Sequence, residues 1–170
     1  MESVTEKKYE TNFFGEFTVS NDIEIRLNGE IVINGITHYP EIRFVDCYQY
    51  YNKMKKCVKI IDDYHKINNI GKRGIVKNYL GNGIVKGYIE EKYTVFDGYI
   101  FIKEYDKENY NKIGIHEFIE KTCPAPAVDL FFERGDIVIV AIYTVGDDDE
   151  LDCIMVEMNN RYNVKNIKIV

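Results

Sequence analysis

The sequence lacks tryptophan, and it also lacks the motifs that identify the common classes of enzyme. Its three histidines, His38, His65 and His116, form neither an HxxxH nor an HExxH pair, so no helix would bring two imidazole rings onto one metal ion. The absence of a GxSxG stretch and of a Walker lysine excludes the nucleophile elbow of hydrolases and the phosphate-binding loop of nucleotide hydrolases. We therefore expect no metal, no cofactor and no catalytic set.

Long apolar stretches are also missing. The longest, residues 137–143, is far shorter than the roughly 20 residues of a membrane span, and the charged residues 1–10 lack the apolar core of a signal peptide. The four cysteines contain no CxxC pair, and a chain of this length buries a core without disulfides. We expect a cytoplasmic protein with reduced, mostly buried thiols and no membrane contact.

Positive charge is scarce at both ends of the chain. Residues 1–45 hold 4 Lys and Arg against 8 Asp and Glu, residues 46–122 hold 14 against 11, and residues 123–170 hold 4 against 9. Nucleic-acid binding is driven by Lys and Arg neutralising phosphates, whereas an acidic body attracts basic partners. The distribution argues against nucleic acid and favours a basic protein partner.

The two ends of the chain have the patterns of strands. Apolar or alternating runs at 13–19, 23–27, 31–33 and 42–45, separated by hairpin signals such as Asn28-Gly29 and Asn34-Gly35, predict an antiparallel meander. Further runs at 128–132, 137–145, 153–158 and 164–169 predict four consecutive antiparallel strands. Because residues 137–143 are apolar without interruption, we expect a central strand covered on both faces.

Residues 46–122 change to a helical period of three and four. Asp46 is the predicted N-cap of a helix that ends near Asn68-Asn69. Its apolar stripe consists of Cys47, Tyr50, Tyr51, Met54, Cys57, Val58, Ile61 and Tyr64. Further helices are predicted at 72–80, closed by Gly81, at 84–96 and at 115–122, with a short strand at 99–102 and an exposed loop at 106–110. In the helix at 84–96, the inward residues would be Ile84, Val85, Tyr88, Ile89 and Phe96.

Together these patterns predict one domain of α+β class. Antiparallel strands at both ends of the chain, residues 1–45 and 123–170, would pack against a central helical block, residues 46–122. The sequence leaves open whether the strands form one sheet or two, and it leaves the oligomeric state open.

The densest charge is a run of five carboxylates in a predicted loop between two strands. The residues are Asp147, Asp148, Asp149, Glu150 and Asp152. A calcium loop would need glycine at the sixth position, where Asp152 stands. A solvated turn that keeps the sheet soluble and an anionic docking surface for a basic protein remain as alternatives. We take these five residues as the candidate partner-binding site.

Two other segments allow a chemical interpretation. Gly81, Gly83 and Gly87 miss the GxGxxG spacing by one residue, which favours a glycine-rich break between two helices over a phosphate site. A thiol near an imidazole can become a nucleophile, so His116 with Cys123 keeps a small hydrolase or transferase open as an alternative.

Several short motifs suggest a family. The stretches at 13–17, 31–35, 143–146, 151–152 and 154–158 resemble a bacterial family catalogued as domain of unknown function 2004, and the resemblance covers the two strand blocks. It implies a sheet-plus-helix protein of the kind often found as immunity proteins, which bind and silence a toxin. The expected function is therefore a non-enzymatic immunity protein that neutralises a basic toxin domain through its acidic surface, with the small enzyme and a structural or assembly subunit as alternatives.

Overall fold

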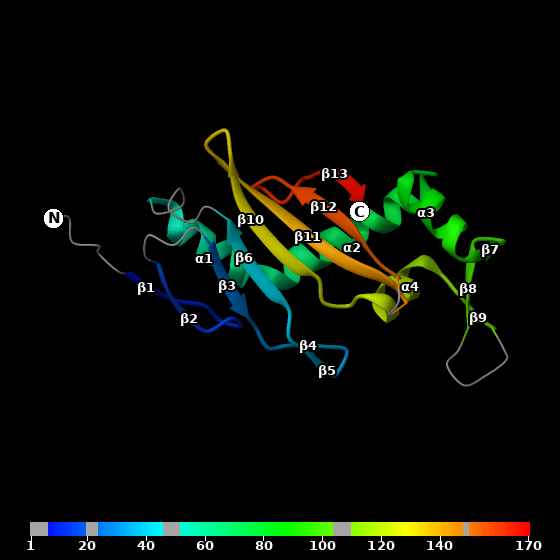
Figure 1. Cartoon of the computed structure of the whole chain (residues 1–170), viewed down its shortest axis with the longest axis horizontal. Helices are drawn as coiled ribbons and strands as arrows, with labels where there is room; N and C mark the ends of the chain where they lie inside the picture. The colour runs from blue at the N-terminus through cyan, green and yellow to red at the C-terminus, as the bar shows by residue number, and fades with distance from the viewer. Residues whose placement is uncertain (1–6, 20–23, 46–51, 104–109, 148–149) are drawn as a thin grey trace.

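The computed structural model describes residues 7–19, 24–45, 52–103, 110–147 and 150–170 (Figure 1). The first part contains β1 (Lys7–Glu10), β2 (Glu16–Val19), β3 (Glu24–Asn28), β4 (Ile31–Ile33), β5 (Ile36–His38) and β6 (Glu41–Val45). The middle contains α1 (Met54–Asp62), α2 (Tyr64–Leu80), α3 (Ile84–Lys92), β7 (Thr94–Phe96), β8 (Tyr99–Lys103), β9 (Tyr110–Ile113) and α4 (Ile115–Thr122). The last part contains β10 (Ala127–Glu133), β11 (Asp136–Asp147), β12 (Glu150–Met158) and β13 (Val164–Ile169). The predicted α+β class, with strands at both ends and helices between them, is confirmed.

The two ends of the chain meet in one six-stranded sheet. Its strand order is β13-β12-β11-β10-β6-β3, so strands from the first part of the chain extend the sheet formed by the last part (Figure 1). All its pairs are antiparallel except β6 with β10, where Arg43 lies opposite Asp129. A parallel pair needs a long crossover, and the helical block between β6 and β10 supplies it.

The predicted antiparallel meander of residues 1–45 is wrong in its connections. β3 pairs directly with β6, while β4 and β5 form a separate hairpin between them, and β1 and β2 form another. Asn34 and Gly35 do make the predicted tight turn, with φ of 52° and 78°. Gly29 has a different role, because a Cβ there would lie 2.5 Å from the ring of buried Phe14.

The helices differ from prediction in where they begin and end. The predicted helix that ends near Asn68-Asn69 is broken at Asp63, and its last part is continuous with the helix predicted at 72–80. α2 continues through Asn68, where we expected a helix to stop, and ends at Leu80 with Gly81 after it, as predicted. Asn68 does not terminate the helix because its buried side chain is engaged by tertiary contacts: its amide donates to the Pro124 carbonyl at 2.8 Å. The predicted N-cap Asp46 and the start of that helix lie outside the described residues.

The segment after α2 also departs from prediction. α3 ends at Lys92, and β7 follows where helix was expected, because Asp97 and Gly98, with φ of 54° and 78°, close a hairpin with β8. Val85 and Ile89 are buried as predicted, whereas Ile84 and Phe96 are exposed. The strand at 99–102 and the helix at 115–122 are confirmed as β8 and α4. The loop predicted at 106–110 falls mostly outside the described residues.

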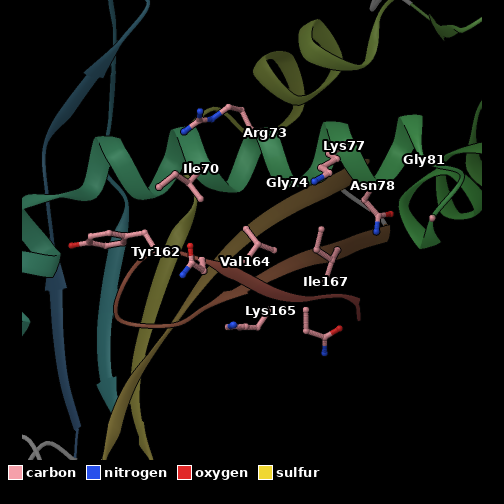
Figure 2. A pocket seen from close by; sticks show the side chains of 13 residues that line it. Ile70, Arg73, Gly74, Lys77, Asn78, Gly81, Tyr162, Val164, Lys165 and Ile167 are labelled. Carbon is pink, nitrogen blue, oxygen red and sulfur yellow. The ribbon is translucent and has the colours of Figure 1, made fainter.

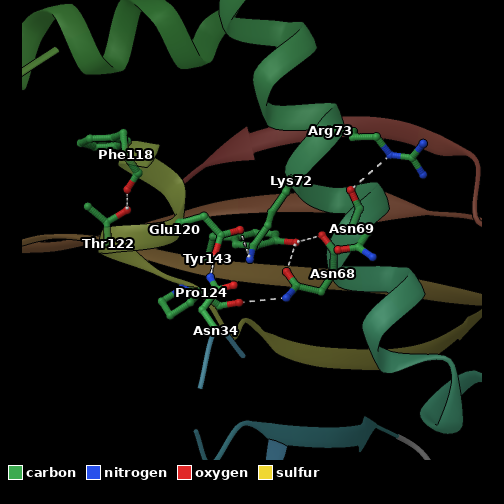
Figure 3. Close-up of polar contacts among 10 residues, drawn as sticks. All are labelled: Asn34, Asn68, Asn69, Lys72, Arg73, Phe118, Glu120, Thr122, Pro124 and Tyr143. Atoms are coloured by element: carbon green, nitrogen blue, oxygen red, sulfur yellow. Dashed lines mark hydrogen bonds and ion pairs between the residues drawn. The ribbon is translucent and has the colours of Figure 1, made fainter. Parts of the chain in front are cut away.

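Buried polar contacts hold α2 against β11 (Figure 3). The Tyr143 hydroxyl lies 2.9 Å from the Asn68 carbonyl oxygen and 3.1 Å from its side-chain oxygen, and Tyr64 donates to the Pro126 carbonyl at 2.6 Å. The contact is close because residue 71 is glycine: a Cβ there would lie 2.3 Å from the Tyr143 hydroxyl oxygen. Helix, sheet and the Pro124–Pro126 segment are therefore fixed relative to one another.

Candidate protein-binding surface

The acidic run lies on a long hairpin. β11 and β12 stay paired up to Asp147 and Glu150, which lie opposite each other on the last rung. The prediction of a loop over 147–152 is therefore wrong in extent, since the strands reach both residues. Asp148 and Asp149 lie outside the described residues. We call residues 147–152 the acidic hairpin.

Asp152 is tied to the helical layer. The Tyr88 hydroxyl of α3 donates to Asp152 Oδ2 at 2.7 Å. Asp152 lies opposite buried Val145 on β11, so its side chain is on the helix side of the sheet, whereas Leu151 is 60% exposed. Of the five predicted site residues, Asp152 thus positions the acidic hairpin against α3.

The central strand has two unequal faces. On β11, Ile137, Ile139, Ala141, Tyr143 and Val145 are buried beneath the helices, while the residues between them are half-buried. α2 and α4 contact β11 from one side, and α2 lies behind the sheet in Figure 1. The expectation of cover on both faces is wrong: in the part of the chain that the structure describes, the helices form a layer on one face.

The uncovered side, which we call the outer face, has an apolar centre. Its central residues are Phe131 of β10, Val138, Val140 and Ile142 of β11, and Met155 of β12. They are half-buried because neighbouring strands hold their side chains side by side. A hollow of about 210 Å³ is lined by four of them, Phe131, Val140, Ile142 and Met155, together with Asp129, Glu157 and Lys168.

Charged pairs flank this apolar centre. Arg43 of β6 binds the Asp129 carboxylate through two nitrogens, and Arg26 of β3 lies near Glu24 and Glu41. The hydrogen bond to Asp129 raises the pKa of Arg43. An apolar centre with a polar rim is the usual composition of a protein interface.

The sequence contained a signal for the outer face that our prediction missed. Asp129 lies within β10 and Glu157 lies near the end of β12, at positions whose side chains point away from the helices. A charged residue at such a position in an otherwise apolar strand indicates that one face of the sheet meets water. Because the apolar run of β11 is uninterrupted, we predicted a central strand covered on both faces.

The geometry gives little support to the alternative catalytic site at His116 and Cys123. His116 is exposed on α4, and Cys123 is partly buried just after that helix. Burial raises the pKa of the Cys123 thiol, which is the opposite of what activates a nucleophile. The described residues contain no group of three or more His, Cys, Asp or Glu side chains arranged to hold a metal ion.

The glycine-rich segment after α2 is a helix break. Asn78 accepts a hydrogen bond from the Val85 backbone at 2.9 Å, and a Cβ at Gly83 would lie 2.4 Å from the Asn78 side chain. The segment therefore joins α2 to α3, and the close packing of Gly83 against Asn78 holds this turn in place.

Comparisons with known proteins found no matching family model, no matching curated protein and no matching solved structure. The resemblance to the domain of unknown function 2004 family thus stays a prediction. Among the described helices, none combines the length and the apolar character needed to cross a bilayer.

Proposed function

We propose that this chain is a binding protein, and most concretely an immunity protein that occludes a basic toxin domain. The observation that carries the proposal is the outer face, an apolar centre with a charged rim on a sheet that extends into the acidic hairpin. Its partner would be a protein with an apolar patch beside a basic surface, such as the substrate groove of a nuclease, because a groove built for phosphates accepts carboxylates.

The dimensions of the outer face suit this role. Six strands spaced about 4.8 Å apart span roughly 24 Å, and the 7 residues of β10 rise roughly 23 Å. The projected area of roughly 550 Å² is comparable to the roughly 800 Å² that each partner contributes to a standard interface. In this arrangement the apolar centre supplies affinity, and the acidic hairpin steers the encounter.

The test begins with affinity capture of the tagged protein from its source cells and identification of any stoichiometric partner. The captured partner, expressed alone, should arrest growth, and co-expression of this chain should restore it. A partner that is neither basic nor toxic would contradict the immunity assignment.

Ile142→Lys then tests the outer face against a matched control. Ile142 lies opposite Ala127 and Met155 on the two neighbouring strands, and the control Ile36→Lys places the same change on β5, where Ile36 is 62% exposed. We expect Ile142→Lys to weaken partner binding by at least about tenfold, with Ile36→Lys unchanged, because a charge at the centre of an interface loses its hydration. Equal affinities of the two variants would refute the role of the outer face.

Neutralisation tests the acidic hairpin separately. A variant carrying Asp147→Asn, Asp148→Asn, Asp149→Asn and Glu150→Gln should associate more slowly and show a flatter salt dependence, while its dissociation rate stays near that of the wild type. An unchanged association rate would remove the acidic hairpin from the proposal.

A further inference from the structure

A second surface lies at the edge of the sheet, between α2 and β13. It is a groove of about 810 Å³ with walls formed by α2, the α2–α3 turn and residues 162–167 (Figure 2). Val164 and Ile167 lie between the β13 ribbon and α2 in this view, and Lys77 extends from the α2 side. The groove is narrow at Gly74, where a Cβ would lie 3.4 Å from Val164.

The groove is basic within an acidic protein. Its lining contains Arg73, Lys77 and Lys165 and no carboxylate, although the chain has a net charge of −6. In Figure 2, Lys77 points from α2 toward β13, whereas Arg73 lies on the side of α2 away from β13 and Lys165 lies on the side of β13 away from α2. A neighbouring hollow adds Lys56 and Arg161 against a single acid, Asp136. Such a band attracts negative charge.

At the Tyr162 end of the groove, the nearby charged side chains already contact other groups of this protein. The Tyr162 hydroxyl donates to Asp63 Oδ2 at 2.5 Å, and the Lys66 ammonium lies 4.7 Å from the centre of the same ring. These contacts hold the ring as a fixed wall and leave the cations farther along the groove to meet a ligand.

The groove runs beside a free strand edge. In the described residues, β13 pairs with β12 alone. Cys153 and Val170 exchange both backbone hydrogen bonds at 2.9 Å, so by the antiparallel alternation the N–H and C=O groups of Ile167 and Ile169 point away from β12. An open edge of this kind accepts another strand.

We propose that this groove binds an extended acidic segment of another protein, which adds beside β13 as a further strand of the sheet. Side chains of an added strand alternate between the two faces. Apolar residues on the helix side would lie against Ile70 and Val164, and acidic residues on the opposite face would lie near Lys165. An acidic residue at the end of the apolar run would reach Lys77 from the helix side. This site is independent of the proposed immunity function, because it uses the sheet edge and the helical layer.

The probe is a labelled peptide of about six residues, the usual strand length, that alternates glutamate and valine. We expect saturable binding, measured by fluorescence anisotropy, that weakens as salt rises. The same peptide with alternate backbone nitrogens methylated keeps its charge but cannot form the ladder, so it should not bind. Equal binding of both peptides, displacement of the probe by equimolar inorganic phosphate, or no saturable binding would overturn the proposal.

Charge reversal identifies the site. A double variant, Lys77→Glu with Lys165→Glu, should weaken peptide binding by about tenfold or more, since two attractive pairs become repulsive. The matched control is a second double variant, Lys55→Glu with Lys59→Glu, on the exposed side of α1 outside the groove, and it should bind as the wild type does. Loss of binding in both, or in neither, would contradict the assignment; circular dichroism verifies that each variant is folded.

Amide exchange provides a second readout that does not depend on substitutions. The peptide should slow exchange at Ile167 and Ile169, whose N–H groups face the free edge, and should leave Asn166 and Lys168, already paired with β12, unchanged. Uniform change along β13, or none, would refute strand addition.

Discussion

Gly71→Ala tests the close packing of α2 on β11. Gly71 is buried in the middle of α2, and an added Cβ would lie 2.3 Å from the Tyr143 hydroxyl and 3.0 Å from two of its ring carbons. Tyr143 is fully buried, so its ring cannot turn aside without displacing neighbours.

Two effects of this substitution lower the stability of the protein, and one effect raises it. Overpacking costs about 1–3 kcal/mol, and displacement of the hydroxyl from the oxygens of Asn68 costs about 1–3 kcal/mol more. The helix itself gains about 1 kcal/mol, because alanine is the better helix former. The net expectation is a destabilisation of about 3 kcal/mol, equivalent to a Tm lower by roughly 6–12 °C.

Gly87→Ala is the control for the helical term alone. Gly87 lies on the exposed side of α3, and no atom lies within 4 Å of an added Cβ, so this variant should be about 1 kcal/mol more stable. Urea denaturation followed by circular dichroism measures both variants. In a Tyr143→Phe background, Gly71→Ala should cost less, since the nearest atom is gone. Stabilisation by Gly71→Ala equal to that by Gly87→Ala would refute the close contact between α2 and β11.

Three further predictions concern titration and tethering. The free energy of unfolding should fall as pH rises above about 9. Burial raises the pKa of Cys57 to about 12 and that of Tyr64 above its ordinary value, so the unfolded chain releases protons that the folded chain keeps. A flat urea-stability profile from neutral to alkaline pH would contradict this. Iodoacetamide should modify the Cys57 thiol in urea and leave it intact in the native protein, as mass spectrometry of the peptide would show. Tyr88→Phe should lower stability by about 1 kcal/mol through loss of the bond to Asp152, whereas exposed Tyr39→Phe should change nothing; equal stabilities by urea denaturation would refute the tether.

Local patterns were sufficient for most elements. The alternation and apolar runs of the last part of the chain predicted β10 to β13, and Asn34-Gly35 predicted a tight turn that the structure confirms. Asp97-Gly98 is the same kind of hairpin signal, but our prediction did not include a turn there and placed residues 94–96 in a helix, where β7 lies. Such features depend on residues a few positions apart, and the sequence contains all of them.

The candidate surfaces depended on long-range contacts. Arg43 and Asp129, which flank the outer face, are 86 residues apart in the chain. Tyr88 and Asp152 are 64 residues apart, and the groove joins α2 to β13. The carboxylates of the acidic hairpin were evident in the sequence, but the apolar surface beside them and the basic groove at the sheet edge were not.

The sequence by itself determined the class of fold, the order of strand and helix blocks and the concentration of carboxylates in residues 147–152, because each arises from the period or composition of neighbouring residues. Only the tertiary structure decided that the strand blocks share one sheet through β6 and β10, that α2 continues past Asn68, and that one face of β11 lacks a helical layer in the described residues. Those outcomes depend on packing and hydrogen bonds between distant segments, which local propensity does not encode.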